Sequence, residues 1–246
     1  MSPTPFSEEG QEELALLVDV FDWQYTTPFE HTFLTGPIDG TEWNTRGYES
    51  PNEDGGGLAI NGLDNTWGFT AAGYHSDPHC FECTPMPFGE DGALARARVV
   101  LEQLGLDLDD LSIRASVLRN DGDEPTSVLV IASLLVEGVR TDVKWVVGYR
   151  NSDGLLAQAS GEYVTVSELG EVPVLTPAEA LEIAGRPVTD EAVADAELTL
   201  ETRFNLDTGE RTLVPVYSVP VSDNLAVDVT IAATRPQDIP ASPQAS

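Results

Sequence analysis

The dipeptide Glu137-Gly138 stands between two apolar runs, SVLVIASLLV at Ser127–Val136 and VRTDVKWVVGY at Val139–Tyr149. Runs rich in β-branched and aromatic residues on either side of a two-residue turn predict a β-hairpin, because glycine supplies the positive φ that a tight turn needs. Two further strand-like runs, Ser112–Arg119 and Leu155–Val164, lie outside this pair behind turns rich in Asn, Asp and Gly. This part of the chain is therefore predicted to form four strands of an antiparallel sheet.

A helix is expected before these strands. From residue 89, apolar residues recur at helical spacing, and Gly105 follows where a C-terminal cap would end the helix. The apolar positions are Leu94, Ala97, Leu101 and Leu104.

The best local signal in the chain is the tetrapeptide Thr176-Pro177-Ala178-Glu179. The threonine can accept the amide of the third helical residue, proline fits the first position, and the glutamate can reach back to the cap. A helix from Pro177 to Ala184 follows from this pattern. A shorter helix over 190–195 and three strands, over 197–205, 212–220 and 225–233, are expected after it.

The first third of the chain is less regular. Ser7–Val20 predicts a short helix, but the following residues up to Phe88 are rich in Gly, Pro, Asn and aromatic side chains. Within them, only Leu58–Ile60 and Thr66–Thr70 have the pattern of short strands around a turn.

Together these patterns predict an α+β protein with antiparallel sheets, each packed by a helix, behind an irregular, aromatic-rich N-terminal region. Since the second and third thirds share the order of a helix followed by antiparallel strands, a tandem duplication is one interpretation. The expected organisation is a helix with irregular chain and short strands (1–88), two helix-plus-sheet regions (89–175 and 176–233), and a Pro/Ser-rich tail (234–246).

The charge of the chain restricts its partners. Forty-two Asp and Glu residues stand against 12 Lys and Arg, which gives a formal net charge of −30 over 246 residues. Such a surface repels nucleic-acid phosphates and anionic lipids, so neither is an expected partner. No stretch approaches the 18 apolar residues of a membrane-spanning helix, so this segment is not expected to insert into a membrane. The acidic excess itself fits plain solubility, adaptation to high salt or cation binding.

The segment from His75 to Cys83 is the one constellation that could carry chemistry. Cys80 and Cys83 have the spacing that grips a soft metal ion, and His75 and His79 could complete a zinc or copper site. A single C-x-x-C without a second pair is a weak metal signal, so we favour a local Cys80–Cys83 disulfide, with a metal site and two free thiols as alternatives. Prolines directly after Cys83 argue against the helix that a thioredoxin-like redox site needs.

Catalytic patterns are otherwise missing from the sequence. It contains three histidines and no G-x-S-x-G elbow, and its carboxylates are too numerous for any pair to indicate catalysis. We therefore predict no catalytic residues, no bound cofactor and no enzyme activity. A hydrolase that the sequence does not reveal stays an alternative, which a cleft joining His31 to several carboxylates would favour.

The segment from Ala93 to Gly185 carries a resemblance. Its runs LEQLGLD, ASGEY and VPVLTPAEAL, with the hairpins between them, resemble exported or lipid-anchored proteins of actinobacteria and, more distantly, extracytoplasmic domains of the PepSY and YycH/YycI type. The resemblance implies an extracytoplasmic regulatory or inhibitory module without catalysis, and it transfers no site residues.

The sequence thus predicts a non-enzymatic extracytoplasmic module that binds a protein or peptide partner, for which an exposed strand edge offers a binding mode. Residues 1–5 and 234–246 have the composition of linkers, so the protein is expected to be secreted or anchored through a segment outside this chain. The alternatives are a zinc or copper protein using His75, His79, Cys80 and Cys83, and the unrecognised hydrolase.

Overall fold

The computed structural model describes the greater part of the chain, which divides into two compact units. Unit 1 comprises Met1–Ala132 and Lys144–Val164, and unit 2 comprises Ser133–Val143 and Thr165–Ser246. The described residues are 8–23, 27–34, 42–49, 56–61, 66–71, 89–119, 125–150, 154–163, 170–204, 211–222, 225–235, 237 and 239.

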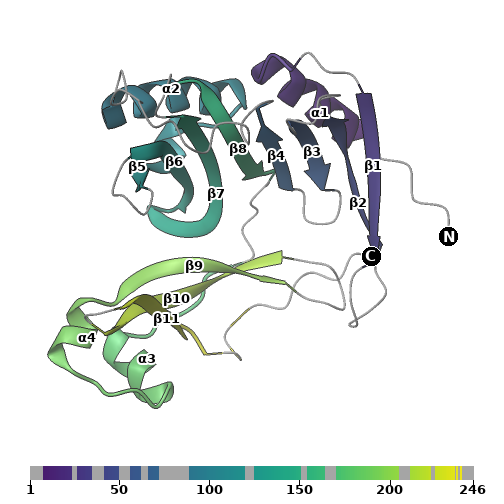
Figure 1. Ribbon diagram of the computed structural model, residues 1–246. Helices are drawn as coiled ribbons and strands as arrows, with labels where there is room; N and C mark the ends of the chain where they lie inside the picture. Colours follow the sequence, from purple (N-terminus) through teal and green to yellow (C-terminus); the bar gives the residue numbers. More distant parts are fainter. Residues whose placement is uncertain are drawn as a thin grey trace. The chain divides into compact units, whose positions relative to one another are not determined.

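Unit 1 contains one sheet built from two runs of antiparallel strands (Figure 1). The strand order is β1-β2-β3-β4-β8-β7-β6-β5, and the two runs join where β4 pairs antiparallel with β8, with Gly68 opposite Ser160. A helix precedes each run. The first run is α1 (Glu8–Val20), β1 (Thr27–Leu34), β2 (Glu42–Glu49), β3 (Gly57–Asn61) and β4 (Thr66–Thr70). The second is α2 (Gly89–Gln103), the 3₁₀ turn η1 (Leu108–Asp110), β5 (Leu111–Arg119), β6 (Pro125–Val136), β7 (Val139–Arg150) and β8 (Leu156–Glu162).

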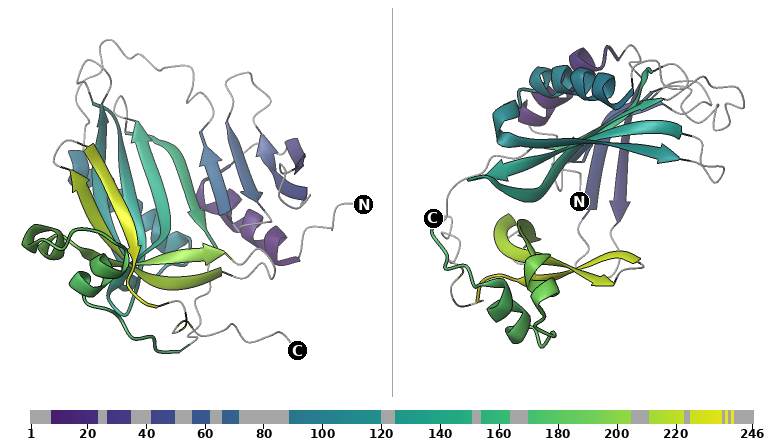
Figure 2. Two further views of the ribbon diagram at one scale, coloured as in Figure 1. Left: turned by 90° about the horizontal axis from the view of Figure 1, so that it is seen from below. Right: turned by 90° about the vertical axis from the view of Figure 1, so that its left-hand side faces the viewer.

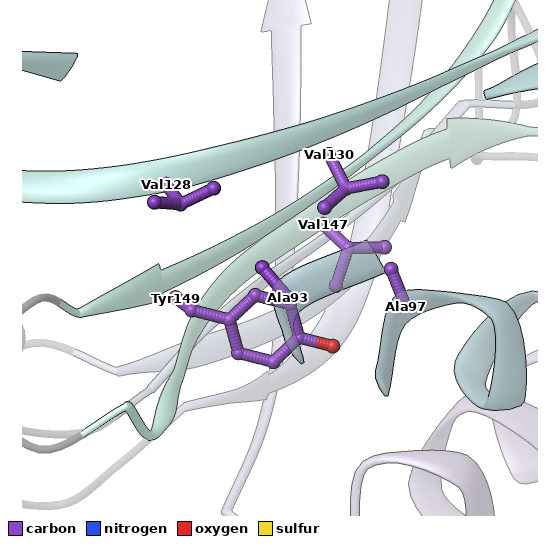
Figure 3. Close-up of a cluster of buried hydrophobic side chains, with 6 residues drawn as sticks. All are labelled: Ala93, Ala97, Val128, Val130, Val147 and Tyr149. Carbon is purple, nitrogen blue, oxygen red and sulfur yellow. The ribbon is translucent and has the colours of Figure 1, made fainter. Parts of the chain in front are cut away.

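Helices α1 and α2 cover the same face of this sheet (Figure 2). Two small residues of α2, Ala93 and Ala97, let the helix approach the strands closely, and both are completely buried. They pack on Val128 and Val130 of β6 and on Val147 and Tyr149 of β7 (Figure 3). Burial raises the pKa of the Tyr149 hydroxyl to about 12, against a smaller opposing effect of the Arg96 charge.

Aromatic side chains fill the core under α1. Phe21, just after the helix, stacks on Phe69 of β4 with ring centroids 4.5 Å apart, and Trp23 meets the same ring edge-on at 5.8 Å. Leu17 of α1 is completely buried. Phe21, Trp23 and Phe69 therefore form an aromatic core that fixes the end of α1 to β4.

Unit 2 is a smaller three-stranded antiparallel sheet with helices on one face. Its strand order is β9 (Glu197–Phe204), β10 (Arg211–Ser222), β11 (Leu225–Ala232). Helices α3 (Pro177–Ile183) and α4 (Asp190–Ala194) precede the strands. The core joins α3 to β10 and β11 through Ala180, Leu181, Tyr217, Val219, Ile231 and Ala233.

The first turn of α3 is a complete capping box. The Glu179 carboxylate accepts hydrogen bonds from the amide and the hydroxyl of Thr176, at 2.8 and 2.7 Å, and the Glu179 amide donates to the Thr176 hydroxyl at 3.4 Å. The backbone hydrogen bond of Thr176, followed by its side-chain hydrogen bond, lowers the pKa of Glu179 below its ordinary value of 4.5. The ionised form of Glu179 therefore stabilises the folded state.

This cap predicts a pH-dependent stability. A carboxyl whose folded pKa is lowered stabilises the protein above its unfolded pKa of about 4.5, and that stabilisation is lost as the pH falls through the lower folded value. We expect the wild type to melt above Glu179→Gln at pH 7, with the difference shrinking below pH ~4.5. Thermal unfolding of both proteins across this range measures the effect, and a difference that is constant with pH would contradict it.

The end of the β6–β7 hairpin belongs to unit 2. Glu137 and Gly138 both have positive φ, 51° and 79°, as a tight two-residue hairpin turn requires. Beyond the turn, Asp142 accepts hydrogen bonds from the Thr202 amide (2.9 Å) and hydroxyl (2.7 Å), and Thr141 forms a parallel bridge with Leu200. The hairpin therefore occupies the outer side of β9.

Removing the Asp142 carboxylate should weaken the attachment of the hairpin end to β9. We expect Asp142→Ala to destabilise unit 2 by about 1 kcal/mol, because an exposed strand amide loses a charged acceptor. Hydrogen exchange at the Thr202 amide is the measurement, and it should accelerate. Glu171→Ala is the matched control, since it removes an exposed carboxylate from the same unit. Equal exchange at Thr202 in all three proteins would show that Asp142 does not hold the edge.

Most of the predicted elements are confirmed. The helices near 8–20, 89–104, 177–184 and 190–195 and the strands from residue 111 onward are found within a few residues of their expected bounds. Two strands were missed, β1 and β2, in the region expected to be irregular. A helix precedes the antiparallel strands that begin at β5 and those that begin at β9, and the tandem duplication of these two regions stays an interpretation. The domain boundaries after residues 88, 175 and 233 stay predictions.

Candidate interaction edge

Strand β5 is the outer strand at one end of the unit 1 sheet. It pairs with β6, and no strand of the described chain pairs with its outward side. Helix α2 leads into it through Gly105 (φ 81°) and η1, where the Asp107 carboxylate accepts a 3.0 Å hydrogen bond from the Asp109 amide. This short, capped connection holds β5 under α2, and within the described ranges the outer main-chain groups of β5 have no strand partner.

One face of β5 carries an apolar row that we call the open row: Ile113, Ala115 and Val117. These side chains pack against the α2 core but are only partly buried. On the neighbouring strand β6, the corresponding apolar row of Val128, Val130 and Ala132 is 1% exposed at each position. Both rows belong to the same sheet. The side chains of β5 are more exposed because β5 has a neighbouring strand on one side only, whereas β6 lies between β5 and β7.

The opposite face of β5 is more polar and more exposed. Arg114, Ser116 and Leu118 are exposed, and the carbonyl of Leu118 accepts a hydrogen bond from the Thr126 hydroxyl at 3.2 Å. Strand β5 therefore has the alternating pattern of an amphipathic strand, with its apolar side toward the helix.

The other outer strands differ from β5 in their edges. Strand β1 contains Pro28, which has no N–H to donate to an added strand. The outer side of β9 is occupied by the hairpin end. In β11 the apolar residue Ile231 is buried under α3, with 6% exposure. Strand β5 carries three incompletely covered apolar side chains, whereas on β11 Val229 is partly buried and Ile231 is buried; the side chains of β1 are not among those described.

The predicted metal and disulfide residues cannot be placed relative to this edge. His75, His79, Cys80 and Cys83 lie outside the described residues, as does any disulfide between the two cysteines. His31 falls in β1, where the backbone is described but the side chain is not. Among the residues whose side chains are described, no three His, Cys, Asp or Glu residues are grouped so as to hold a metal ion.

None of the helices in the described ranges has the length and apolar character needed to cross a bilayer.

Comparison with known proteins does not assign this chain to a family. No family model matches the chain, and no curated protein sequence matches it. A solved structure, the Bacillus megaterium YpeB C-terminal domain, is similar over 89% of each chain, with 12% sequence identity and a TM-score of 0.41.

Proposed function

We propose that this chain is a non-enzymatic binding module that takes up an extended segment of a protein or peptide partner as an added strand on β5. The observation that carries the proposal is the open row. Its side chains are partly exposed, whereas the neighbouring apolar row of β6 is buried. An added strand would cover these side chains and pair the outward N–H and C=O groups of β5. The extracytoplasmic location is part of the proposal and is supported by the sequence resemblance alone.

The energetics favour an extended partner segment. Main-chain hydrogen bonds contribute roughly 1 kcal/mol each, and burial of the remaining apolar surface adds about 25 cal/mol per Å². An extended segment obtains both contributions at once, because its main chain pairs with β5 while alternate side chains cover the open row. A helix packed on the same edge would leave the strand's main-chain groups unpaired.

The test uses a synthetic peptide as the probe. Acetyl-Thr-Val-Thr-Val-Thr-Val-Thr-amide can pair as a strand, and the same peptide with alternate amide nitrogens methylated on its pairing edge cannot. We expect the first to bind and to protect outward β5 amides from hydrogen exchange, and the methylated peptide to do neither. Protection appearing elsewhere in the protein, or equal effects of the two peptides, would contradict strand addition at β5.

A charge in the open row should block this binding. We expect Val117→Lys to weaken binding of the unmethylated peptide by about tenfold or more, because a docked strand would trap the ammonium group against apolar side chains. Ser116→Lys is the matched control on the exposed, polar face of the same strand, and it should change the affinity less than about twofold. Calorimetry or fluorescence titration measures both, and an unchanged amide spectrum of Val117→Lys shows that its fold is intact. Equal affinities for the two variants would remove β5 as the site.

The zinc or copper site at His75, His79, Cys80 and Cys83 stays a second proposal that rests on the sequence. Thiol titration with and without reductant, together with metal analysis of the purified protein, separates a metal site from a disulfide and from free thiols. Stoichiometric metal that is lost on substitution of Cys83 would favour metal binding over the partner-binding role.

A further inference from the structure

Ala115 has the smallest side chain of the open row. It lies between Ile113 and Val117, and all three side chains are partly buried. The methyl group of an alanine extends less far from the sheet than the branched side chains of its two neighbours. A partner strand that covers the row therefore has more room for a large side chain opposite Ala115 than opposite either neighbour.

The flank of α2 nearer to β5 is apolar at Leu94. On the other flank, the Arg96 guanidinium donates a 2.9 Å hydrogen bond to the Gly154 carbonyl, in the connection between β7 and β8 and therefore away from β5. Leu94 lies about 160° around the helix from Arg96, and it is only partly buried. A large apolar residue of a partner strand would therefore extend the existing contact between α2 and β5.

The opposite face of β5 presents an exposed cation, Arg114, whose neighbours on that face are uncharged. Ser112 and Ser116 lie two residues away on the same strand. The nearest carboxylate in the sequence, that of Asp110, is four residues away, which is roughly 13 Å along an extended chain. Within the described residues, no ion pair involves Arg114. The residues of β6 on this face within unit 1 are also uncharged: Ser127, Leu129 and Ile131.

We infer that the partner segment carries a large apolar residue opposite Ala115 and, next to it, an acidic residue opposite Arg114. This inference rests on the proposed strand addition and names the side-chain chemistry of its occupant. Because side chains alternate along a strand, two adjacent residues of the segment meet the two faces of β5 at once. The large residue is buried toward α2, and the carboxylate pairs across the strands on the exposed face, where it keeps its contact with water.

A second copy of this chain is a poorer occupant. If two β5 strands paired antiparallel about their centre, Ala115 would face Ala115, and each Arg114 would face Ser116 of the other copy. Such a pair would supply neither the large residue nor the carboxylate. It would also bring together two chains of net charge −30, which opposes association.

The first experiment compares two peptides of identical composition. Acetyl-Thr-Val-Thr-Phe-Thr-Val-Thr-amide places its phenylalanine opposite Ala115 when its three apolar residues cover the open row, in either strand direction. Acetyl-Thr-Phe-Thr-Val-Thr-Val-Thr-amide places it opposite Ile113 or Val117. We expect the first to bind the full chain about three- to tenfold more tightly. Ala115→Val should abolish this preference by filling the available room, and Ser116→Val, on the opposite face of the same strand, should keep it.

The second experiment tests the carboxylate. Acetyl-Thr-Val-Glu-Phe-Glu-Val-Thr-amide places a glutamate opposite Arg114 in either direction, and the same peptide with glutamine at both positions is its neutral counterpart. The ratio of their affinities should shift against the glutamate peptide by about two- to fivefold in Arg114→Gln. Arg186→Gln is the matched control, because it removes an exposed cation from unit 2 and changes the net charge equally. It should leave the ratio unchanged.

The contrary outcomes separate this inference from strand addition itself. Equal binding of the two phenylalanine isomers, or an equal shift in the Arg114 and Arg186 variants, would overturn the inference while the uncharged Thr-Val peptide still bound. A dimer of the chain that is lost in Val117→Lys would make a second copy the occupant and overturn it as well. Failure of every one of these peptides to bind would overturn strand addition together with the inference.

Discussion

Replacing Gly161 by alanine is expected to destabilise unit 1 by about 3 kcal/mol or more. Gly161 lies in β8 between two indole rings, and a Cβ there would overlap the Trp145 Cδ1 atom and lie 2.9 Å from the Trp67 Cζ2 atom. Both tryptophans are nearly completely buried, and the Trp145 Nε1 group donates a 3.1 Å hydrogen bond to the Glu162 carbonyl. Neither ring can move aside without losing packing or this hydrogen bond, so the strain falls on the strands.

The measurement is denaturant unfolding followed by tryptophan fluorescence. All four tryptophans of the chain, at 23, 43, 67 and 145, lie in unit 1, so this signal reports on that unit. Gly68→Ala is the matched control, because Gly68 lies on the adjacent strand β4 and a Cβ there meets nothing within 4 Å. The control should be unchanged or up to about 1 kcal/mol more stable. Similar destabilisation by the two substitutions would contradict the packing of the two indoles around Gly161.

Leu101→Ala is the second substitution with a large expected effect. Leu101 lies in the last turns of α2 and is completely buried, and its carbonyl accepts the Leu106 amide at 3.1 Å as the chain leaves the helix. Truncation of a buried leucine leaves a cavity and typically costs about 2–5 kcal/mol. We expect a loss in this range, measured by the same fluorescence-detected unfolding.

Val99→Ala provides the control for Leu101. Val99 lies two residues earlier on α2 and is 53% exposed, so its truncation should change the stability by less than about 0.5 kcal/mol. If the two substitutions have equal effects, the assignment of the buried face of α2 is wrong, and with it the placement of the helix over the open row.

From residue 89 onward, local signals in the sequence were enough to predict the helices and strands. The capping box at Thr176 and the Glu137-Gly138 turn were predicted because their geometry depends on neighbouring residues alone. Strands β1 and β2 were missed because Pro28 and Gly47 interrupt the strand pattern. The β4–β8 pairing that joins the two runs of strands could not be predicted, since Gly68 and Ser160 are far apart in sequence and nothing local marks them as partners.

The candidate site was predictable only in part. The alternation of Ile113, Ala115 and Val117 with polar residues indicates an amphipathic strand, and the predicted strand Ser112–Arg119 matches β5. That β5 is an outer strand depends on β8 pairing with β4 instead of closing back on β5, which is a property of the whole sheet. The general expectation of an exposed strand edge could therefore be stated from sequence, but its location could not.

Residue-resolved hydrogen exchange of the free protein tests the proposed edge most directly. If β5 is open, its amides should alternate, with those paired to β6 protected and those directed outward exchanging roughly 100-fold faster or more, while the amides of β6 are protected throughout. Uniform protection along Leu111–Arg119, equal to that of β6, would mean that the outward side of β5 is already covered, and strand addition there would be excluded.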